Sequence, residues 1–324
     1  MPTLLVTLGA DALSDRQLDA IRDAAPDHEV VRQPDAETLG EAEVVLGSFP
    51  RAALADAPRL RWVQSWSAGV DWLLEPDDAD APELPTGLML TTASGVHPVP
   101  IAEHVLAVVL AFARDLPAWL DAQGERRWAR GTPPDRGRTF ELAGRRLTLL
   151  GVGEVGSRIA RVMHALGVHV TAVEHTPGDA DLPGVDHTIT NDELIDALPE
   201  TDLLVVTLPL TDATRGLVGA GAIAALPDHA IVVNVGRGGV VDEAALASAL
   251  AGGRLGGAAL DVFETEPLPE DSPLWGLDRV ILTPHTAGFT PHYADRALAL
   301  FLDNLSRYQR GEPLDNTVDL GEGY

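Results

Sequence analysis

Three polar side chains in the second half of the chain are suited to proton transfer on a molecule that carries a carboxylate. Arg237 follows a run of β-branched residues that ends at Val235. Glu266 lies just beyond a second apolar run, which ends at Asp261, and His285 ends a third. A guanidinium can hold a carboxylate with two parallel hydrogen bonds, an imidazole exchanges one proton near neutrality, and a nearby carboxylate favours the protonated ring. We expect the three to meet, because active sites of open α/β sheets lie at the carboxyl ends of the strands.

A glycine-rich turn, Gly151–Gly156, has the spacing GxGxxG that binds a pyrophosphate. An apolar run precedes it, an amphipathic helix pattern follows it, and the next strand pattern delivers Glu174 at its end. Gly151 allows the tight turn, Gly153 lets the backbone approach the ligand, and Gly156 lets the helix pack closely on the strands. The pyrophosphate would bind the unpaired N–H groups at the helix N-terminus, and Glu174 would accept hydrogen bonds from an adenosine ribose. The pattern predicts a dinucleotide site.

A third candidate is the stretch Ser65–Asp71, where a strand pattern ends in a glycine turn. Backbone N–H groups in such a turn can bind a small anion, for instance a carboxylate. The alternative is a plain strand-to-helix turn, and the residues alone leave both open.

The elements that must position these groups alternate between strand and helix patterns, which favours parallel sheets. In the first ninety residues, Ser14 has the pattern of a helix cap with Gln17 completing a capping box. Strand patterns in this part cover Thr3–Leu8, Glu29–Val31, Val44–Leu46, Leu60–Gln64 and Leu88–Leu90.

The character of the chain changes near Ser94–Pro98. A long apolar helix is expected over Ile101–Leu116, ended by Pro117, and a polar, extended arm over Trp119–Pro134. Counting the strand that precedes the glycine turn, we expect six parallel strands in a doubly wound sheet. A last helix, about Pro291–Arg310, is expected to return to the first domain.

The composition excludes several kinds of chemistry. The 324 residues include no cysteine, which rules out disulfides, a thiolate nucleophile and cysteine-ligated zinc. No HExxH-like spacing suggests a metal site, so we expect none. The N-terminus has no basic segment, and no uncharged apolar stretch is long enough for a membrane span. We therefore expect a soluble, cytoplasmic protein.

The charge is strongly acidic. Asp and Glu number 49 against 23 basic residues, a net charge of −26, and no lysine occurs. Such a surface repels nucleic acid and anionic membranes, so we expect neither as a partner. Self-repulsion of this size is screened in molar salt, where the Debye length falls to about 3 Å. We therefore predict a high-salt cytoplasm. The alternative, a GC-rich codon bias, explains arginine in place of lysine but not the excess of acid.

These stretches together resemble the D-2-hydroxyacid dehydrogenases over essentially the full length of the chain. The matching blocks, in order, are Ser67–Asp71, Gly151–Gly156, Pro209–Thr211 with Thr214, Asn234–Gly238, Leu260–Pro267 and Pro284–Gly288. Their number, order and spacing make the match specific. The resemblance implies an α/β fold of two doubly wound parallel-sheet domains. Residues 1–95 plus 289–324 would form a flavodoxin-like, discontinuous substrate domain, and residues 96–288 a Rossmann nucleotide-binding domain.

The resemblance also implies roles for single residues. Arg237, Glu266 and His285 would be catalytic, with His285 as acid/base and Glu266 paired to it. Arg237 would hold the carboxylate and keto oxygen of the substrate, so the implied substrate-binding set is Ala68, Gly69, Val70, Arg237 and His285. Family members commonly form homodimers through the nucleotide domain, to which the helix Ile101–Leu116 and the arm Trp119–Trp128 would contribute.

The implied cofactor is NAD or NADP. Family members that prefer NAD usually carry Asp where this chain has Glu174, and Glu keeps the charge that repels a 2′-phosphate, so NAD is slightly favoured. His175 and Thr176 could bind a phosphate, which leaves NADP open. The residues expected to contact the cofactor are Gly151, Gly153, Glu154, Val155, Gly156, Glu174, His175, Thr176, Leu208, Pro209, Thr214, Val235, Gly236, Arg237, Asp261, His285 and Ala287.

The function that follows is reversible reduction of a small 2-keto acid to a D-2-hydroxy acid, with the proton supplied by His285. One alternative is a glyoxylate/hydroxypyruvate reductase of the same family, which differs in pocket size. Another is a nucleotide-sensing binding protein without catalysis on the same fold, against which the intact Arg–Glu–His set speaks. The residues expected to shape the substrate pocket are Phe49, Trp66, Val96, Trp275 and Tyr293.

Overall fold

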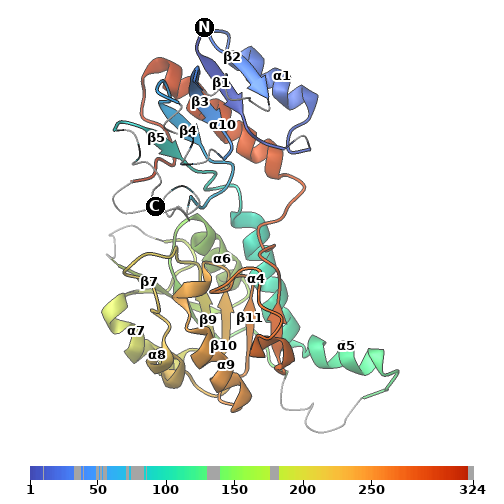
Figure 1. Ribbon diagram of the computed structural model, residues 1–324. Coiled ribbons are helices and arrows are strands. Elements are labelled where there is room, and N and C mark those ends of the chain that lie inside the picture. Colours follow the sequence, from blue (N-terminus) through green and yellow to red (C-terminus); the bar gives the residue numbers. More distant parts are fainter. Residues whose placement is uncertain are drawn as a thin grey trace. The chain divides into compact units, whose positions relative to one another are not determined.

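The computed structural model of the chain divides into two compact α/β units, which we describe separately (Figure 1). The first contains Met1–Val96 and Thr290–Tyr324, and the second His97–Phe289. The structure describes residues 1–319 except 10, 33–37, 39, 49–50, 52, 54–56, 71–72, 74–83, 85, 130–138 and 176–181.

The first unit contains a five-stranded, all-parallel sheet in the order β2-β1-β3-β4-β5. This is the flavodoxin-like order, and it confirms the fold class predicted for this part of the chain. The strands are short and mostly buried, as expected for a parallel sheet covered on both faces. Their bounds are β1 Thr3–Val6, β2 Glu29–Arg32, β3 Ala42–Leu46, β4 Trp62–Gln64 and β5 Met89–Thr91.

Two helices that are far apart in the sequence pack beside this sheet, α1 (Asp15–Ala24) and α10 (Tyr293–Arg310). Figure 1 shows the red C-terminal helix next to the blue N-terminal strands. Phe301 of α10 is fully buried and stacks on Trp62 with ring centroids 5.4 Å apart. The capping box predicted at Ser14 is confirmed, because Ser14 and Gln17 each accept from the other's backbone N–H.

The second unit contains a seven-stranded parallel sheet in the order β12-β11-β10-β9-β6-β7-β8. The strands are β6 Arg146–Leu150, β7 His169–Glu174, β8 His187–Thr190, β9 Leu203–Val206, β10 Ile231–Asn234, β11 Gly257–Leu260 and β12 Val280–Leu282. The order is the doubly wound one, with an extra edge strand. The predicted count of six was wrong because it omitted β8, a mostly polar strand that pairs with β7 at the edge of the sheet and is exposed or partly buried along its length.

Apolar layers cover both faces of this sheet. One layer joins α4 (Pro98–Ala113) and α6 (Glu154–Ala165), and Val109 and Met163 are buried in it. The other joins the short helices of the remaining connections, which are α7 Leu194–Ala197, α8 Ala220–Ala225 and α9 Glu243–Ala251. Short 3₁₀ turns cover Asn191–Glu193, Leu198–Glu200, Gly238–Val240 and Pro273–Gly276.

The expected helix Ile101–Leu116 begins and ends elsewhere. α4 begins at Pro98, and its prolines lie in the first turn, where a missing N–H costs no hydrogen bond. It ends at Ala113, because buried Asp115 adopts a left-handed conformation (φ 54°) and pairs with Arg279 at 2.9 Å. Pro117 then lies in the first turn of a new helix, α5 (Leu116–Gly124), so it does not end the first helix.

The arm predicted to be extended from Trp119 is therefore helical as far as Gly124. Its last part, from residue 130 on, lies outside the described residues. Among the helices that the structure describes, none is both long and apolar enough to span a bilayer.

Candidate active site

The three side chains singled out at strand ends line one pocket of about 610 Å³ in the second unit. His285 Nδ1 lies 2.8 Å from Glu266 Oε2, and Glu266 Oε1 accepts a hydrogen bond from the Phe263 N–H at 3.0 Å. A carboxylate only accepts, so Nδ1 carries a hydrogen and Nε2 is the ring nitrogen that can exchange a proton. Arg237 lines the same pocket. The structure thus brings together the residues from the ends of β10, β11 and β12.

Asp261 holds the segment that carries His285. Its carboxylate accepts hydrogen bonds from the Thr283 hydroxyl at 2.6 Å and from the N–H groups of Thr286 and Ala287 at 2.9 Å each. The His285 N–H donates to the Asp261 carbonyl at 2.8 Å. His285 itself has φ 54°, a strained conformation for a residue with a Cβ, so the surrounding bonds must hold it there. Asp261 therefore fixes the backbone segment that carries the imidazole.

The loop after β10, which carries Arg237, is pressed against the loop after β11, which carries Glu266. A Cβ built on Gly238 would lie 1.9 Å from the Phe263 carbonyl carbon and 2.4 Å from the Glu264 backbone nitrogen. Beside this contact, the Glu243 N–H donates to Glu264 Oε1 at 3.1 Å, and the Glu264 N–H donates to Glu243 Oε1. Only a residue without a side chain fits between the two loops.

We predict that Gly238→Ala destabilises the fold and separates Arg237 from Glu266. The added methyl meets backbone atoms that cannot move aside, so the free energy of unfolding should fall by about 3 kcal/mol. A misplacement of about 1 Å in such a site lowers kcat/KM by about 100-fold. Chemical denaturation and steady-state kinetics measure the two effects.

The matched control is the next residue, Gly239→Ala. Its Cβ would meet the two terminal carbons of Leu210 at 3.2 Å, and these can rotate away. We expect stability and activity close to wild type. Equal losses in both variants would show that the Gly238 contact has no special part in the site.

The glycine turn has the geometry that a pyrophosphate site needs. Gly151 has φ 90°, and a Cβ on Gly156 would lie 2.0 Å from the Gly151 carbonyl oxygen. A Cβ on Gly153 would meet nothing within 4 Å, so space is open above the turn. No described residue accepts a hydrogen bond from the first backbone N–H groups of α6, those of Glu154 and Val155. These residues fit a dinucleotide phosphate.

The other expected cofactor residues lie around the same strand ends. Gly236 lies against the end of β9, where its Cβ would come within 2.5 Å of the Leu208 carbonyl, and the Thr214 hydroxyl donates to the Pro209 carbonyl at 2.6 Å. Val235 is buried at the end of β10. Glu174 ends β7 half-buried, followed by exposed His175, and Thr176 lies outside the described residues.

In the first unit, the turn after β4 presents N–H groups and hides its carbonyls. The Ser65 and Ser67 carbonyls accept from the Gln64 side chain at 3.1 Å and the Ala93 N–H at 2.9 Å, and the Ser67 hydroxyl donates to the Gly69 carbonyl at 2.6 Å. In the part of the chain that the structure describes, nothing accepts from the N–H groups of residues 68–70. We call this turn the anion turn (residues 65–70), and the N–H groups of residues 68–70 are its candidate donors to an anion.

An aromatic pair flanks the anion turn. The Tyr293 hydroxyl donates to the Trp66 carbonyl, and the two rings meet edge to face with centroids 5.8 Å apart. Burial raises the pKa of Tyr293 to about 12, so this phenol stays protonated. Of the other residues expected to shape the pocket, Val96 is buried in this unit, Trp275 is mostly exposed in the second unit, and Phe49 lies outside the described residues.

His97, which the sequence did not single out, lies near the Arg–Glu–His cluster in the second unit. Its Nδ1 is 3.2 Å from the Gly288 carbonyl, and a Cβ on Gly288 would strike the ring at 2.6 Å. Burial lowers the pKa of His97, the Gly288 carbonyl raises it, and the charges of His285 and Arg237 lower it. The net effect lowers the pKa of His97, which favours the neutral form of its ring. The one feature of the sequence that could have singled out His97 was its position directly before Pro98.

A pocket of about 530 Å³ opens at the opposite, amino-terminal ends of the strands. Three of its polar side chains contact one another, since Asp202 lies 2.8 Å from both Arg145 and His229. Among the described residues, no group of three His, Asp or Glu side chains has the arrangement of a metal site.

The fold and the glycine turn place the second unit among Rossmann-type nucleotide-binding domains. Residues 106–287 match the family model described as D-isomer specific 2-hydroxyacid dehydrogenase, NAD binding domain. The chain belongs to the D-isomer specific 2-hydroxyacid dehydrogenase family, as the resemblance predicted.

Individual relatives agree with this membership. D-3-phosphoglycerate dehydrogenase of Mycobacterium tuberculosis is 33% identical over 99% of this chain, and the chain spans 60% of that protein's length. Glyoxylate reductase of Aeropyrum pernix is 35% identical, over 82% of this chain and 78% of its own. A solved D-isomer specific 2-hydroxyacid dehydrogenase of Xanthobacter autotrophicus Py2, in complex with NADPH and MES, is 34% identical, with a TM-score of 0.81 over 100% of both chains.

Proposed function

We propose that this protein is an NAD(P)-dependent oxidoreductase that interconverts small 2-keto acids and D-2-hydroxy acids. The observation that carries the proposal is the hydrogen bond of 2.8 Å between His285 Nδ1 and Glu266 Oε2, in a pocket that Arg237 also lines. This pairing leaves Nε2 free for a proton, and the guanidinium supplies the charge that an oxo acid requires. Family membership and the names of the relatives support the same reaction class.

In this proposal, each residue has a separate task. Arg237 binds the carboxylate and polarises the keto oxygen, and the free N–H groups of the anion turn hold the carboxylate. His285 Nε2 donates its proton to the keto oxygen during reduction and removes it again during oxidation. Glu266 keeps the ring oriented and compensates the positive charge of the imidazolium. Asp261 keeps the His285 segment in place through its three accepted hydrogen bonds.

The glycine turn would hold the pyrophosphate of the dinucleotide, and Glu174 the adenosine ribose. When bound, the nicotinamide supplies the hydride. The residues that follow β9 and β10 would line the path between the pyrophosphate and the nicotinamide. They are Leu208, Pro209, Thr214, Val235 and Gly236.

An absorbance assay of reduced nicotinamide oxidation tests the proposal. NADH and NADPH are each offered with glyoxylate, hydroxypyruvate, pyruvate and longer 2-keto acids, in molar KCl. Turnover of any of these acids supports the oxidoreductase. If reduced coenzyme binds but no acid turns over, the chain is a nucleotide-sensing binding protein on this fold.

A narrower candidate within this function is a glyoxylate/hydroxypyruvate reductase. The observation that favours it is the 35% identity to a protein named glyoxylate reductase. The ratio of kcat/KM for glyoxylate over that for a branched 2-keto acid tests it, and a ratio below one would contradict it.

We propose that Glu174 makes the enzyme prefer NADH, since its carboxylate would repel a 2′-phosphate. We predict that Glu174→Gln raises kcat/KM for NADPH by about tenfold through the KM, with little change for NADH, as loss of one repelling charge implies. Steady-state kinetics with each coenzyme at saturating keto acid measures it. His187→Gln, an exposed change on β8, is the control. Preference for NADPH in the wild type would show that Glu174 turns away from the ribose.

We further propose that the protein works in a high-salt cytoplasm, on account of its net charge of −26. Between about 0.1 M and about 3 M KCl the repulsion between surface carboxylates is screened, so the thermal unfolding midpoint should rise by more than about 10 °C. Calorimetry in KCl measures it. A midpoint that stays constant or falls would show that the acidic surface does not require salt.

A homodimer is proposed as the working form. Several large apolar side chains of the second unit are exposed on α5 and just after it, namely Leu116, Leu120 and Trp128. Exposed apolar surface of this kind is usually covered by a partner. Light scattering of the purified chain gives the mass, and a monomer at micromolar concentration would contradict the proposal.

A further inference from the structure

The last residue of β4, Gln64, is buried directly before the anion turn, and its side-chain amide is bound at both ends. Its Nε2 donates to the Ser65 carbonyl at 3.1 Å. Its Oε1 accepts from the Thr91 hydroxyl at 2.8 Å and from Asn304 Nδ2 at 3.1 Å. These three bonds leave the amide a single orientation, and the Ser65 carbonyl is drawn back into the protein with it.

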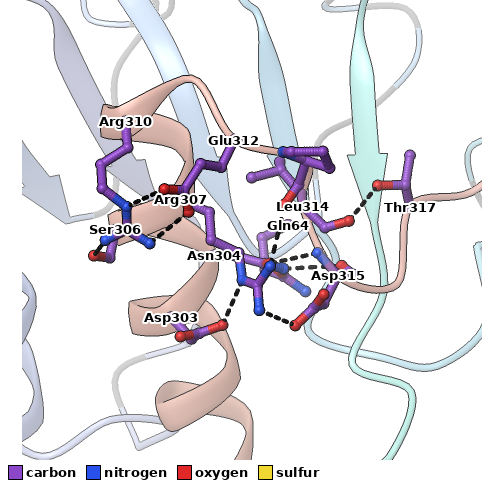
Figure 2. Close-up of polar contacts among 11 residues, drawn as sticks. Gln64, Asp303, Asn304, Ser306, Arg307, Arg310, Glu312, Leu314, Asp315 and Thr317 are labelled. Carbon is purple, nitrogen blue, oxygen red and sulfur yellow. Dashed lines mark hydrogen bonds and ion pairs between the residues drawn. The ribbon is translucent and has the colours of Figure 1, made fainter.

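Asn304 comes from α10, at the far end of the sequence, and is fully buried. Figure 2 shows its side chain between Gln64 and the segment that follows the helix. Its Nδ2 also donates to the Asp315 carbonyl at 3.0 Å, and its Oδ1 accepts from the Asp315 N–H at 2.8 Å. Arg307 joins this segment to α10, because it forms ion pairs with Asp303 of the helix at 2.7 Å and with Asp315 of the segment at 3.0 Å (Figure 2).

The network is complete on the side of the strands as well. Trp62 Nε1 donates to the Thr91 hydroxyl at 2.8 Å, and that hydroxyl in turn donates a hydrogen bond to Gln64 Oε1. Each side-chain nitrogen and oxygen atom of Gln64 and Asn304 has at least one partner among the described residues. A buried network of this kind is rigid, because moving one member leaves another unpaired in a low dielectric. We call Trp62, Gln64, Thr91 and Asn304 the Gln64 network.

The position of the Ser65 carbonyl matters for binding an anion. This carbonyl begins the anion turn, in which the N–H groups of residues 68–70 have no acceptor among the residues that the structure describes. A peptide turned the other way would direct a partial negative charge toward the bound carboxylate and would reorient the following N–H groups. The donors can bind an anion only while the carbonyls stay withdrawn.

We propose that Gln64 and Asn304 are positioning residues for the substrate, since they hold the anion turn in the conformation that binds a carboxylate. The inference rests on the proposed function, in which this turn binds the substrate carboxylate. It goes beyond that function because neither side chain belongs to the turn, and α10 thereby contributes to binding through Asn304.

The test is Gln64→Met, which keeps the length of the side chain and removes its polar atoms. We expect the KM for the keto acid to rise by about tenfold, while kcat and the KM for the reduced coenzyme stay within about twofold, as is typical when ground-state and transition-state binding are lost alike. Thr91→Val, which keeps the shape of the side chain and removes its hydrogen bonds with Gln64 Oε1 and Trp62 Nε1, is expected to raise the KM by about threefold. Thr91→Val also tests the proposal if Gln64→Met does not fold.

The matched control is Tyr308→Phe, on the same helix. It removes the hydrogen bond of 2.7 Å to Glu43 but keeps the ring that stacks on Trp62. Even if Tyr308→Phe lowers the thermal unfolding midpoint as much as Gln64→Met does, it should leave the KM for the keto acid unchanged. An unchanged KM in Gln64→Met and Thr91→Val, or an equal rise in Tyr308→Phe, would overturn the positioning role. A wild-type chain that turns over no 2-keto acid would instead overturn the proposed function.

Discussion

His285→Asn is expected to lower kcat by about 1,000-fold in both directions of the reaction, because asparagine cannot exchange a proton. The affinity for reduced coenzyme, measured by fluorescence titration, should stay within about twofold, since the glycine turn lies apart from the ring. The amide can still donate to Glu266, so the loop should keep its conformation. Loss of the proton, and not of the fold, then accounts for the effect.

Two comparisons make this result decisive. His164→Asn removes an exposed histidine that contacts Asp186 at 3.5 Å, and it should behave as wild type. Thermal unfolding of the His285 variant should match wild type or exceed it, because the strained φ of 54° is better tolerated by asparagine. A kcat within a few-fold of wild type would exclude His285 as the acid/base.

The strand ends were predictable because a parallel sheet brings consecutive carboxyl ends to one edge. Short apolar runs located β10, β11 and β12, and the polar residue after each run was then a candidate for the pocket. The same reasoning located the glycine turn, since a strand, a helix and an acid at the next strand end leave few other arrangements. Arg237, Glu266 and His285 do line one pocket.

Close contacts between distant segments were not predictable. The Gly238 contact with Phe263 depends on how two loops approach, and the sequence shows a glycine without showing its neighbour. The bond between Gln64 and Asn304 joins residues 240 positions apart. A buried amide has the same letter as an exposed one, so no pattern in a single sequence marks it. Such pairs follow from tertiary packing, which local periodicity does not encode.

Local errors had local causes. β8 lacks an apolar run, because an edge strand that is only partly buried needs none. The break between α4 and α5 was assigned to Pro117, but proline is acceptable in a first turn, and the break lies at Asp115, whose buried pair with Arg279 stabilises a left-handed residue. Propensity alone favoured the wrong position because the deciding partner comes from another part of the chain.

Arg237→Gln is expected to lower kcat/KM for the keto acid by about 1,000-fold. Glutamine can donate one hydrogen bond but brings no charge, and a carboxylate left without its cation in a partly buried pocket loses its main attraction. The backbone should be undisturbed, because Asn234 holds the Arg237 carbonyl at 3.0 Å and the Gly236 N–H at 3.1 Å whatever the side chain is. Steady-state kinetics at saturating coenzyme measures the loss.

Arg237→Lys separates charge from geometry. Lysine restores the positive charge but not the two parallel hydrogen bonds, so it should recover about tenfold of the loss and no more. The control, Arg254→Gln, removes an exposed arginine that pairs with Asp228 at 2.7 Å on the surface and should retain full activity. Full recovery in Arg237→Lys would mean that a point charge suffices. Unchanged activity in Arg237→Gln would show that Arg237 does not hold the carboxylate.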